Sequence, residues 1–540
     1  MSELAVPSTP AAAAGRPNLN DEPHAATLPV FLLLLVAGLG YGVYGLLSDM
    51  NGAGGEPLAL GAFVLLGIAL LIALGFEFVN GFHDTANAVA TVIYTHSLPP
   101  VVAVIWSGFF NFLGVVLSSG AVAYSIVNLL PVELILQVGS AAGYAMIFAL
   151  LIAAIIWNLG TWYLGLPNSS SHALIGSVIG VGLANQLMAP AGQATSGVDW
   201  NQALTVLKAL LFSPACGFIL AGLLLLVMKL VIRNRQLYQS PDGRHPPPPW
   251  IRGLLILTCT GVSFAHGGND GQKGMGLIML ILIGAAPTAF ALNRTMSEAA
   301  TPAFLATTQQ AHAVFQGHAG AAPAPDAAQA RQTIDTAVRT EKLNTPEVFA
   351  ALATLSGDIG NQVRDYGAIR RVPAAATQNL RNEMYLTGDA VRLLPKSGAT
   401  LSDADKTALG DYGRSLNGGT RYIPTWVKVS VAVALGLGTM VGWKRIVVTV
   451  GEKIGKQHLT YAEGASAELV AAGTIGLAEA YGLPVSTTHI LSSGVAGAMA
   501  ANGSGLQWAT VRNMAMAWVL TLPAAITLSG VLYVVLREVF

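Results

Sequence analysis

The chain has 540 residues, of which 53% are hydrophobic and only 10% are charged, and its mean hydropathy is positive. A soluble protein would carry about 25% charged residues, so the composition excludes an ordinary soluble domain and indicates a membrane protein. The formal net charge is zero, so no basic field favours a nucleic-acid partner. Cys216 and Cys259 lie in or beside apolar runs, without disulfide or metal-ligand spacing.

Residues 1–28 are small, polar and Pro/Ala-rich, and we expect a disordered tail rather than a signal peptide, because no basic start leads directly into an apolar core. Apolar runs of roughly twenty residues or more, the length that crosses a bilayer, follow. They are Pro29–Leu47, Leu58–Ile93, Val101–Leu130, Ala141–Gly165, Ala203–Val231, Gly253–Ala289, Pro424–Gly442, Ala465–Gly482 and Trp508–Leu536. With the shorter runs Ser171–Met188 and Thr488–Ala501, we predict an all-α polytopic membrane protein of about ten to twelve segments.

The apolar run Leu58–Ile93 contains a polar stretch at Asn80–Thr91. An ionisable residue at membrane depth costs at least a few kcal/mol, so Asp84 in this stretch predicts a functional site. The alternative is that Asp84 and His83 only satisfy one another or a neighbouring helix. Glu77 stands seven residues before Asp84, on about the same helical face if the helix is continuous, and is a proton-relay candidate.

A hydroxyl-rich motif, Pro-Asn-Ser-Ser-Ser-His-Ala-Leu-Ile-Gly, occupies residues 167–176. Proline suits the first turn of a helix, serine is a preferred N-cap residue, and the first backbone N–H groups of a helix bind anions. The motif therefore predicts an anion site, with simple helix capping as the alternative. His172 either orients the helix start or titrates near a pH of about 6.5.

Both motifs occur a second time. Residues 266–276 read His-Gly-Gly-Asn-Asp-Gly-Gln-Lys-Gly-Met-Gly, and aligning Asp84 with Asp270 sets Asn87 opposite Lys273. Residues 484–493 read Pro-Val-Ser-Thr-Thr-His-Ile-Leu-Ser-Ser, so the proline, the hydroxyls and the histidine recur. The alternating order of the two motifs predicts a duplication, each half carrying an acidic and a hydroxyl-rich helix break.

The two halves are separated and unequal in length. Asp84 precedes His172 by 88 residues, whereas Asp270 precedes His489 by 219, so we expect an insertion in the second half. Its charges are mixed in sign, and it reads as a helical, water-exposed element. The expected divisions are membrane repeat 1 at 29–232, a Pro-rich basic linker at 233–252, the start of repeat 2 at 253–291, the insert at 292–422, and the remainder of repeat 2 at 423–540.

The short basic loops set the orientation. Lys229 to Arg252 and Lys444 to Lys456 are rich in Lys and Arg, which the positive-inside rule puts in the cytoplasm. If the segment with Asp270 crosses once, the insert faces the other side, and the two halves have opposite orientations. We therefore predict two inverted-topology repeats with discontinuous helices or re-entrant hairpins.

Two repeats with broken helices are typical of secondary transporters, in which half-helix N-termini face an anionic substrate and carboxylates or unwound carbonyls hold the coupling cation. Hydroxyl and amide donors from two copies would enclose a tetrahedral oxyanion. Lys273 either pairs with Asp270 or Asp84, or touches the anion. The alternatives are an intramembrane hydrolase, disfavoured because no acidic group lies near the Ser-x-His at 170–172, and a channel.

At these residues the chain resembles a known family. Residues 80–88, 266–271, 166–172 and 482–489 resemble the signatures of the inorganic phosphate transporter (PiT) family, with the bacterial low-affinity permeases as the most similar kind. The resemblance implies phosphate symport with protons or sodium, an inverted-repeat fold, and a site built from the four motifs. Bacterial members are thought to be proton-coupled and to carry phosphate partly as a metal complex. Lys273 lacks the amide of Asn87, which disfavours a two-sodium arrangement.

From these residues we expect a non-enzymatic transporter that imports inorganic phosphate across the inner membrane by symport, most simply with protons, by alternating access. A sodium-coupled symporter and a permease for another oxyanion such as sulfate are the alternatives. The expected substrate-binding residues are Asp84, Asn87, Asn269, Asp270, Lys273, Ser169, Ser170, Ser171, Ser486, Thr487 and Thr488. The expected proton or coupling-ion residues are Asp84, Asp270, Glu77, Glu468, His172 and His489. We expect no resident cofactor or protein metal site; phosphate and the lipid bilayer are the partners, a homodimer is a candidate assembly, and nucleic acid is not expected.

Overall fold

The computed structural model describes residues 17–19, 25–54, 58–84, 86–127, 129, 140–189, 197–242, 245–340 and 342–540, with the side chains of residues 86, 87, 141 and 201 excepted. Helices are the only regular elements in these ranges, apart from one isolated β-bridge between Gly455 and Leu506. The predicted tail at 1–28 lies largely outside the described residues, and a helix begins at Thr27. The all-α prediction is confirmed.

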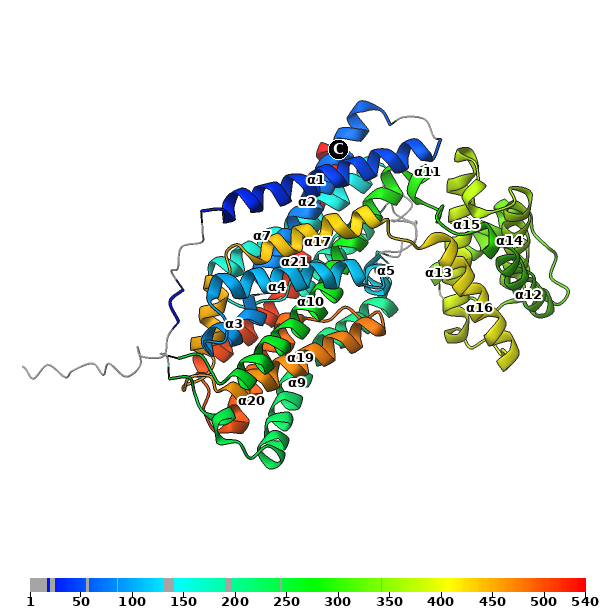
Figure 1. The fold of residues 1–540 in the computed structure, drawn as a ribbon. Coiled ribbons are helices and arrows are strands. Elements are labelled where there is room, and N and C mark those ends of the chain that lie inside the picture. The colour runs from blue at the N-terminus through cyan, green and yellow to red at the C-terminus, as the bar shows by residue number, and fades with distance from the viewer. Residues whose placement is uncertain are drawn as a thin grey trace, which may run out of the picture.

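A tilted bundle of apolar helices makes up the membrane part (Figure 1). Its first half comprises α1 Thr27–Gly52, α2 Leu60–Asp84, α3 Ala86–Tyr94, α4 Pro100–Leu117, α5 Ala121–Val127, α7 Ala141–Tyr163, α8 Ser170–Leu187 and α9 Trp200–Val231. Its second half comprises α10 Pro249–Ala285, α11 Pro287–Phe290, α17 Thr425–Thr439, α18 Lys444–Val448, α19 Tyr461–Ala480, α20 Thr487–Asn502 and α21 Trp508–Val539.

Six helices of the described chain are long and apolar enough to cross a membrane: α1, α2 with α3, α4, α7, α9 and α21. A seventh is added if α17 and the helix before it, bent by 76°, count as one span. The helices α8, α10 and α20, which carry three of the four polar motifs, fall outside this set, as does α19, which carries Glu468. The count of about ten to twelve segments, which includes broken segments, stays a prediction.

The second acidic motif does not interrupt its helix, which corrects an expectation from the sequence. α10 runs unbroken from Pro249 to Ala285, through all of residues 266–276. The glycines that suggested a break allow close packing instead, since a Cβ on Gly267 would lie 2.1 Å from the backbone oxygen of Asn111 in α4. Small residues let membrane helices approach closely, and this packing outweighs the low helix propensity of glycine.

Helices of the two halves pair reciprocally. α8 packs on α21 and α20 packs on α9, while α4 packs on α10 and α17 packs on α2. Equivalent glycines allow the first two contacts: a Cβ on Gly180 would lie 2.2 Å from the oxygen of Ile526, and one on Gly497 would lie 2.0 Å from the oxygen of Phe218. Each half therefore supplies its hydroxyl-motif helix to a long helix of the other.

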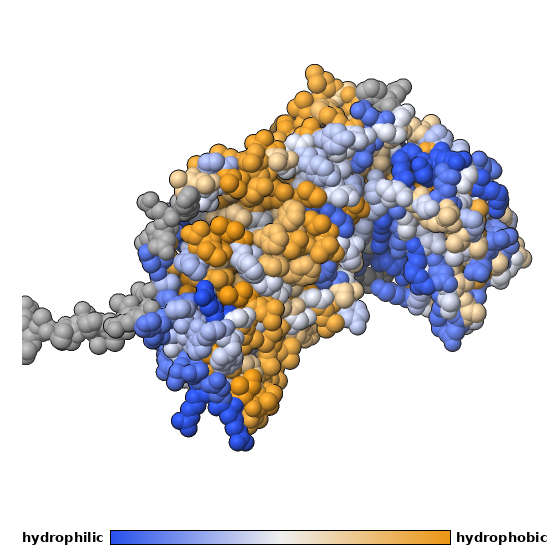
Figure 2. Space-filling model, viewed as in Figure 1, coloured by the Kyte–Doolittle hydropathy of each residue, from blue (hydrophilic) through white to orange (hydrophobic). Residues whose placement is uncertain are grey.

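The region between α11 and α17 forms a separate group of helices at one end of the bundle (Figure 1). It comprises α12 Thr301–Ala319, α13 Ala327–Thr340, α14 Pro346–Asp365, α15 Ala374–Leu393 and α16 Asp403–Thr420. These helices enclose an apolar core of their own, and their surface is hydrophilic where that of the bundle is apolar (Figure 2). Arg392 of α15 binds Asp199, the N-cap of α9, at 2.9 Å between Nη2 and Oδ2.

Candidate functional site

Two helix starts lie next to each other inside the bundle. Ser169 caps α8 by accepting a hydrogen bond from the backbone N–H of His172 at 3.2 Å, and Ser486 caps α20 by accepting one from His489 at 3.1 Å. The imidazole rings of His172 and His489 are 4.5 Å apart between centroids. The capping role is thus observed for both serines, and the two helix N-termini meet.

The hydroxyl motif of the second half reaches the acidic motif of the first. Thr488 Oγ1, in the first turn of α20, donates to Asp84 Oδ1 at the end of α2, at 2.8 Å. The same oxygen is hydrogen-bonded to His83 Nδ1 at 2.8 Å, and His83 Nε2 lies 3.1 Å from Thr161 Oγ1 of α7. All these groups are buried. Asp84 is therefore paired with His83 and with a neighbouring helix, as the structural alternative also describes, and its role in binding stays a prediction.

The reverse contact also forms, from the first half to the second. Lys273 Nζ donates to Asp270 Oδ1 at 2.7 Å, to Ser171 Oγ, and to the backbone oxygen of Val485 at 3.2 Å. Ser171 Oγ itself donates to that oxygen at 2.9 Å. Thr487 Oγ1 lies 3.4 Å from Asp270 Oδ2. Lys273 is therefore paired with Asp270, and its contact with an anion stays a prediction.

Asp84 and Asp270 converge on His266, one turn before Asp270 in α10. One donor atom from each of the three side chains lies within 4.8 Å of the other two, and all three residues are buried. His266 Nδ1 is 3.0 Å from Asn111 Oδ1, and its Nε2 is 3.5 Å from Asp270 Oδ2. Two carboxylates and an imidazole are a donor set that suits a cation.

The sequence motifs did not identify His266 as a site residue, although it begins the second acidic motif. Its spacing of four from Asp270 in a helix was the available signal, because such residues share a face. A helix break at residues 266–276, as predicted from the sequence, would have removed that shared face. The continuity of α10 restores it.

The remaining expected site residues have more varied surroundings. Ser170 Oγ accepts a hydrogen bond from Asn158 Nδ2 at 3.1 Å. Asn269 holds the loop before α20, donating to the oxygen of Leu483 at 3.1 Å. The His489 ring stacks on Trp518 at 4.2 Å. The side chain of Asn87 lies outside the described residues.

The two glutamates expected to carry protons are both fully buried. Glu77 accepts from Asn80 Nδ2 at 3.4 Å, and its side chain packs against Gly274, next to Lys273. Glu468 of α19 lies in a separate polar cluster, where its two oxygens accept hydrogen bonds from Thr91 of α3 and Thr258 of α10. Glu77 therefore adjoins the Lys273–Asp270 pair, whereas Glu468 links three helices.

Comparisons with known proteins add independent evidence. Residues 80–529 match the model of the phosphate transporter family. The chain is 43% identical over 490 residues to the low-affinity inorganic phosphate transporter PitA of Escherichia coli K12, covering 87% of this chain and 96% of PitA. It is 41% identical over 497 residues to PitB of the same organism, covering 88% and 98%. A probable low-affinity inorganic phosphate transporter of Bacillus subtilis is 29% identical over 481 residues, covering 88% and 99%.

One solved structure, titled the sodium-dependent phosphate transporter, matches with a TM-score of 0.48 and 21% identity, covering 88% of this chain and all of that one. The family match alone spans well over half of the chain, and PitA and PitB match along nearly their whole lengths. Its length, its four motifs and its relatives agree, and the chain belongs to the phosphate transporter family.

Proposed function

We propose that this protein imports inorganic phosphate across the inner membrane by symport with protons, through alternating access of its two halves. The observation that carries the proposal is the pair of crossed contacts, Thr488 to Asp84 and Ser171 to the Lys273–Asp270 pair. Relatives that share most of the chain are named as phosphate transporters, which supports phosphate over sulfate as the oxyanion.

Phosphate binding follows from the two adjacent helix starts. The first-turn N–H groups of α8 and α20 and the hydroxyls of their motifs supply donors for phosphate oxygens, and each helix N-terminus carries partial positive charge. Lys273 adds a full positive charge, already shared with Asp270. A carboxylate can accept a hydrogen bond from a phosphate O–H but not from fully ionised sulfate, so Asp84 and Asp270 favour a protonated oxyanion.

Alternating access is supported by how the halves are joined. Each crossed contact ties a hydroxyl motif of one half to an acidic motif of the other, and the helices behind them pair in the same crossed manner. A phosphate that takes the Thr488 and Ser171 hydroxyls as donors competes for them with Asp84 and with the backbone oxygen of Val485. Binding therefore weakens the contacts between the halves, which is the change that a rocking motion about a central site requires.

Proton coupling is supported by the buried carboxyls. The oxygens of Glu468 accept hydrogen bonds from two threonine hydroxyls, and Glu468 forms no ion pair with any Lys or Arg of the described residues. A charged carboxylate in that position is costly, and a proton removes the cost. Glu77 has one oxygen, Oε1, with no hydrogen-bond partner among the described residues. Both carboxyls thus suit the role of groups that gain and lose protons during the cycle.

The Asp84, His266 and Asp270 cluster favours a second form of the cargo. Two carboxylate oxygens and one imidazole nitrogen could take a divalent cation together with phosphate as a neutral complex, and the same oxygens could take sodium. In either case the cation is cargo or coupling ion rather than a resident cofactor.

Asp84→Asn and Asp270→Asn test the assignment in proteoliposomes loaded with equal amounts of folded protein. Each variant keeps the size of the side chain and removes the proton acceptor, so we expect phosphate uptake to be lost. Asp49→Asn is the matched control, because Asp49 accepts a hydrogen bond from Trp426 in α17, outside the site, and should transport normally. Normal uptake by either site variant would reject the proposed roles.

A further inference from the structure

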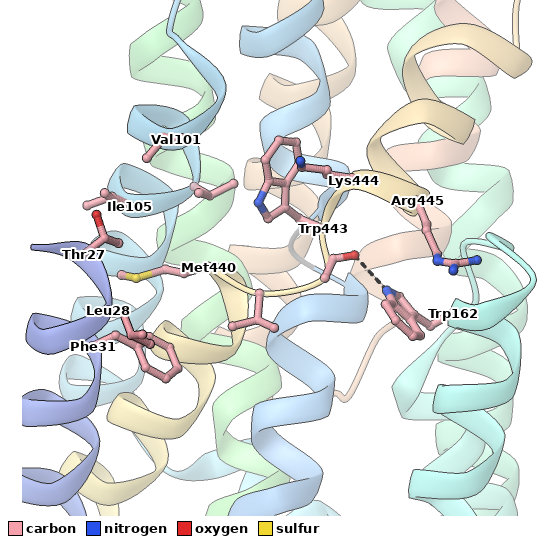
Figure 3. Close-up of a pocket in the computed structure, with 13 residues that line it drawn as sticks. Thr27, Leu28, Phe31, Val101, Ile105, Trp162, Met440, Trp443, Lys444 and Arg445 are labelled. Carbon is pink, nitrogen blue, oxygen red and sulfur yellow. Dashed lines mark hydrogen bonds between the residues drawn. The ribbon is translucent and has the colours of Figure 1, made fainter. Parts of the chain in front are cut away.

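A groove opens on the side of the bundle where α1 begins and α7 ends (Figure 3). Its volume is about 510 Å³. Phe31 of α1, Ile105 of α4 and Met440, which follows α17, contribute to its apolar walls. The groove is thus an apolar space on the outside of the membrane helices, and its lining includes none of the predicted site residues.

Two basic side chains stand at one edge of this groove. Lys444 and Arg445 begin α18, both are exposed, and neither forms an ion pair with any carboxylate of the described residues. Arg445 Nη1 donates to the oxygen of Tyr163 at 2.8 Å, and its guanidinium carbon lies 5.2 Å from the centre of the Trp162 ring. Arg445 is therefore held in position without an ion pair among the described residues.

Tryptophans mark the same edge as a membrane interface. Trp162 Nε1 donates to the oxygen of Gly442 at 2.8 Å, and Trp443 also lines the groove (Figure 3). Trp is enriched at the headgroup level of membranes, and Lys or Arg in short loops marks the cytoplasmic side. The apolar walls, the aromatic edge and the basic side chains thus follow the order of acyl chain, interface and headgroup in one leaflet.

We propose that this groove binds an anionic phospholipid of the cytoplasmic leaflet, with an acyl chain along the apolar walls and the phosphate-containing headgroup on Lys444 and Arg445. A free anion would not use the apolar walls, and a zwitterionic lipid would gain less from the two cationic side chains. The Trp162 ring also packs edge-on against the Phe82 ring, with the two ring centroids 5.3 Å apart. Phe82 directly precedes His83 in the chain. The bound lipid therefore contacts the C-terminal end of α7, where Thr161 is hydrogen-bonded to His83, the partner of Asp84.

Quenching of tryptophan fluorescence by brominated lipids tests this without measuring transport. The full-length protein is reconstituted in phosphatidylcholine vesicles containing increasing fractions of brominated phosphatidylglycerol or, in parallel, brominated phosphatidylcholine. Two of the chain's nine tryptophans, Trp162 and Trp443, line the groove. We expect phosphatidylglycerol to quench a fraction of the emission at a lower mole fraction than phosphatidylcholine does.

The variants assign that preference to the groove. A basic residue near an anionic surface contributes about a fivefold preference, so Lys444→Gln should lose about fivefold and the double variant Lys444→Gln/Arg445→Gln the whole preference. The single variant guards against misfolding, because Lys444 makes no hydrogen bond to the described residues whereas Arg445 does. Arg233→Gln/Arg235→Gln, another exposed basic pair, is the matched control and should keep the preference.

Three results would overturn the inference. The first is equal quenching by the two lipids in the wild-type protein. The second is a preference that survives in the double variant. The third is groove-dependent quenching that is absent in the full-length protein and appears only when residues 1–26 are deleted. That result would identify this chain's own tail as the occupant of the groove.

Discussion

Replacement of Thr488 by valine removes one crossed contact and leaves the shape of the side chain. The lost interaction is the 2.8 Å hydrogen bond from Thr488 Oγ1 to Asp84 Oδ1, between two buried groups. A hydrogen bond to a charged group contributes about 1.5 to 3 kcal/mol. If this hydrogen bond holds Asp84 in the geometry that transport requires, loss of its energy should lower kcat/KM for phosphate roughly 10- to 150-fold.

The assay is the initial rate of labelled phosphate uptake into proteoliposomes, corrected for the amount of incorporated protein. Thr488→Ser is the matched control, because it keeps the hydroxyl and should retain most of the rate. Uptake by Thr488→Val within twofold of wild type would refute the reasoning. Equal loss in the serine and valine variants would refute it too, since it would assign the effect to packing rather than to the hydrogen bond.

Three further predictions concern stability. Breaking the buried Lys273–Asp270 pair with Lys273→Gln alone should cost about 3 to 5 kcal/mol, whereas adding Asp270→Asn should recover part of that loss; additive losses in thermal unfolding would contradict a direct pair. Gly497→Ala should destabilise by about 1 to 3 kcal/mol, because the added Cβ would lie 2.0 Å from a backbone oxygen, while Gly473→Ala, with nothing within 4 Å, should be neutral or stabilising; equal unfolding temperatures would contradict the close approach. In α15, burial and then the nearby Asp358 carboxylate raise the pKa of Glu383 from 4.5 to about 7. The folded state therefore holds a proton that the unfolded chain releases, so the stability of the folded state falls as pH rises from about 4.5 through 7. In thermal unfolding, the Glu383→Gln variant should lack this pH-dependent loss of stability.

The sequence predicts the parts of the site better than their pairing. Motif chemistry gave helix capping by Ser169 and Ser486 as the alternative to an anion site, and both serines do cap helices, because capping depends on residues only a few positions away. Which hydroxyl meets which acid depends on how the halves pack, so the contact of Thr488 with Asp84, 404 positions apart, has no local signal.

The unbroken course of α10 was missed for a related physical reason. Glycine has low helix propensity in isolation, and residues 266–276 contain five of them. In the folded chain Gly267 and Gly276 touch backbone atoms of Asn111 and Ala123, so tertiary contacts stabilise a helix that the local sequence disfavours. The apolar runs, in contrast, were sufficient to predict an all-helical membrane protein, because the bilayer admits few alternatives.

The most direct test of the central claim is labelled phosphate uptake into proteoliposomes that hold this protein, with an inward proton gradient and no sodium. Our account predicts accumulation that collapses when a proton-conducting ionophore is added. Uptake that requires sodium and ignores the proton gradient would contradict proton coupling, and the absence of uptake with either ion would contradict phosphate as the substrate.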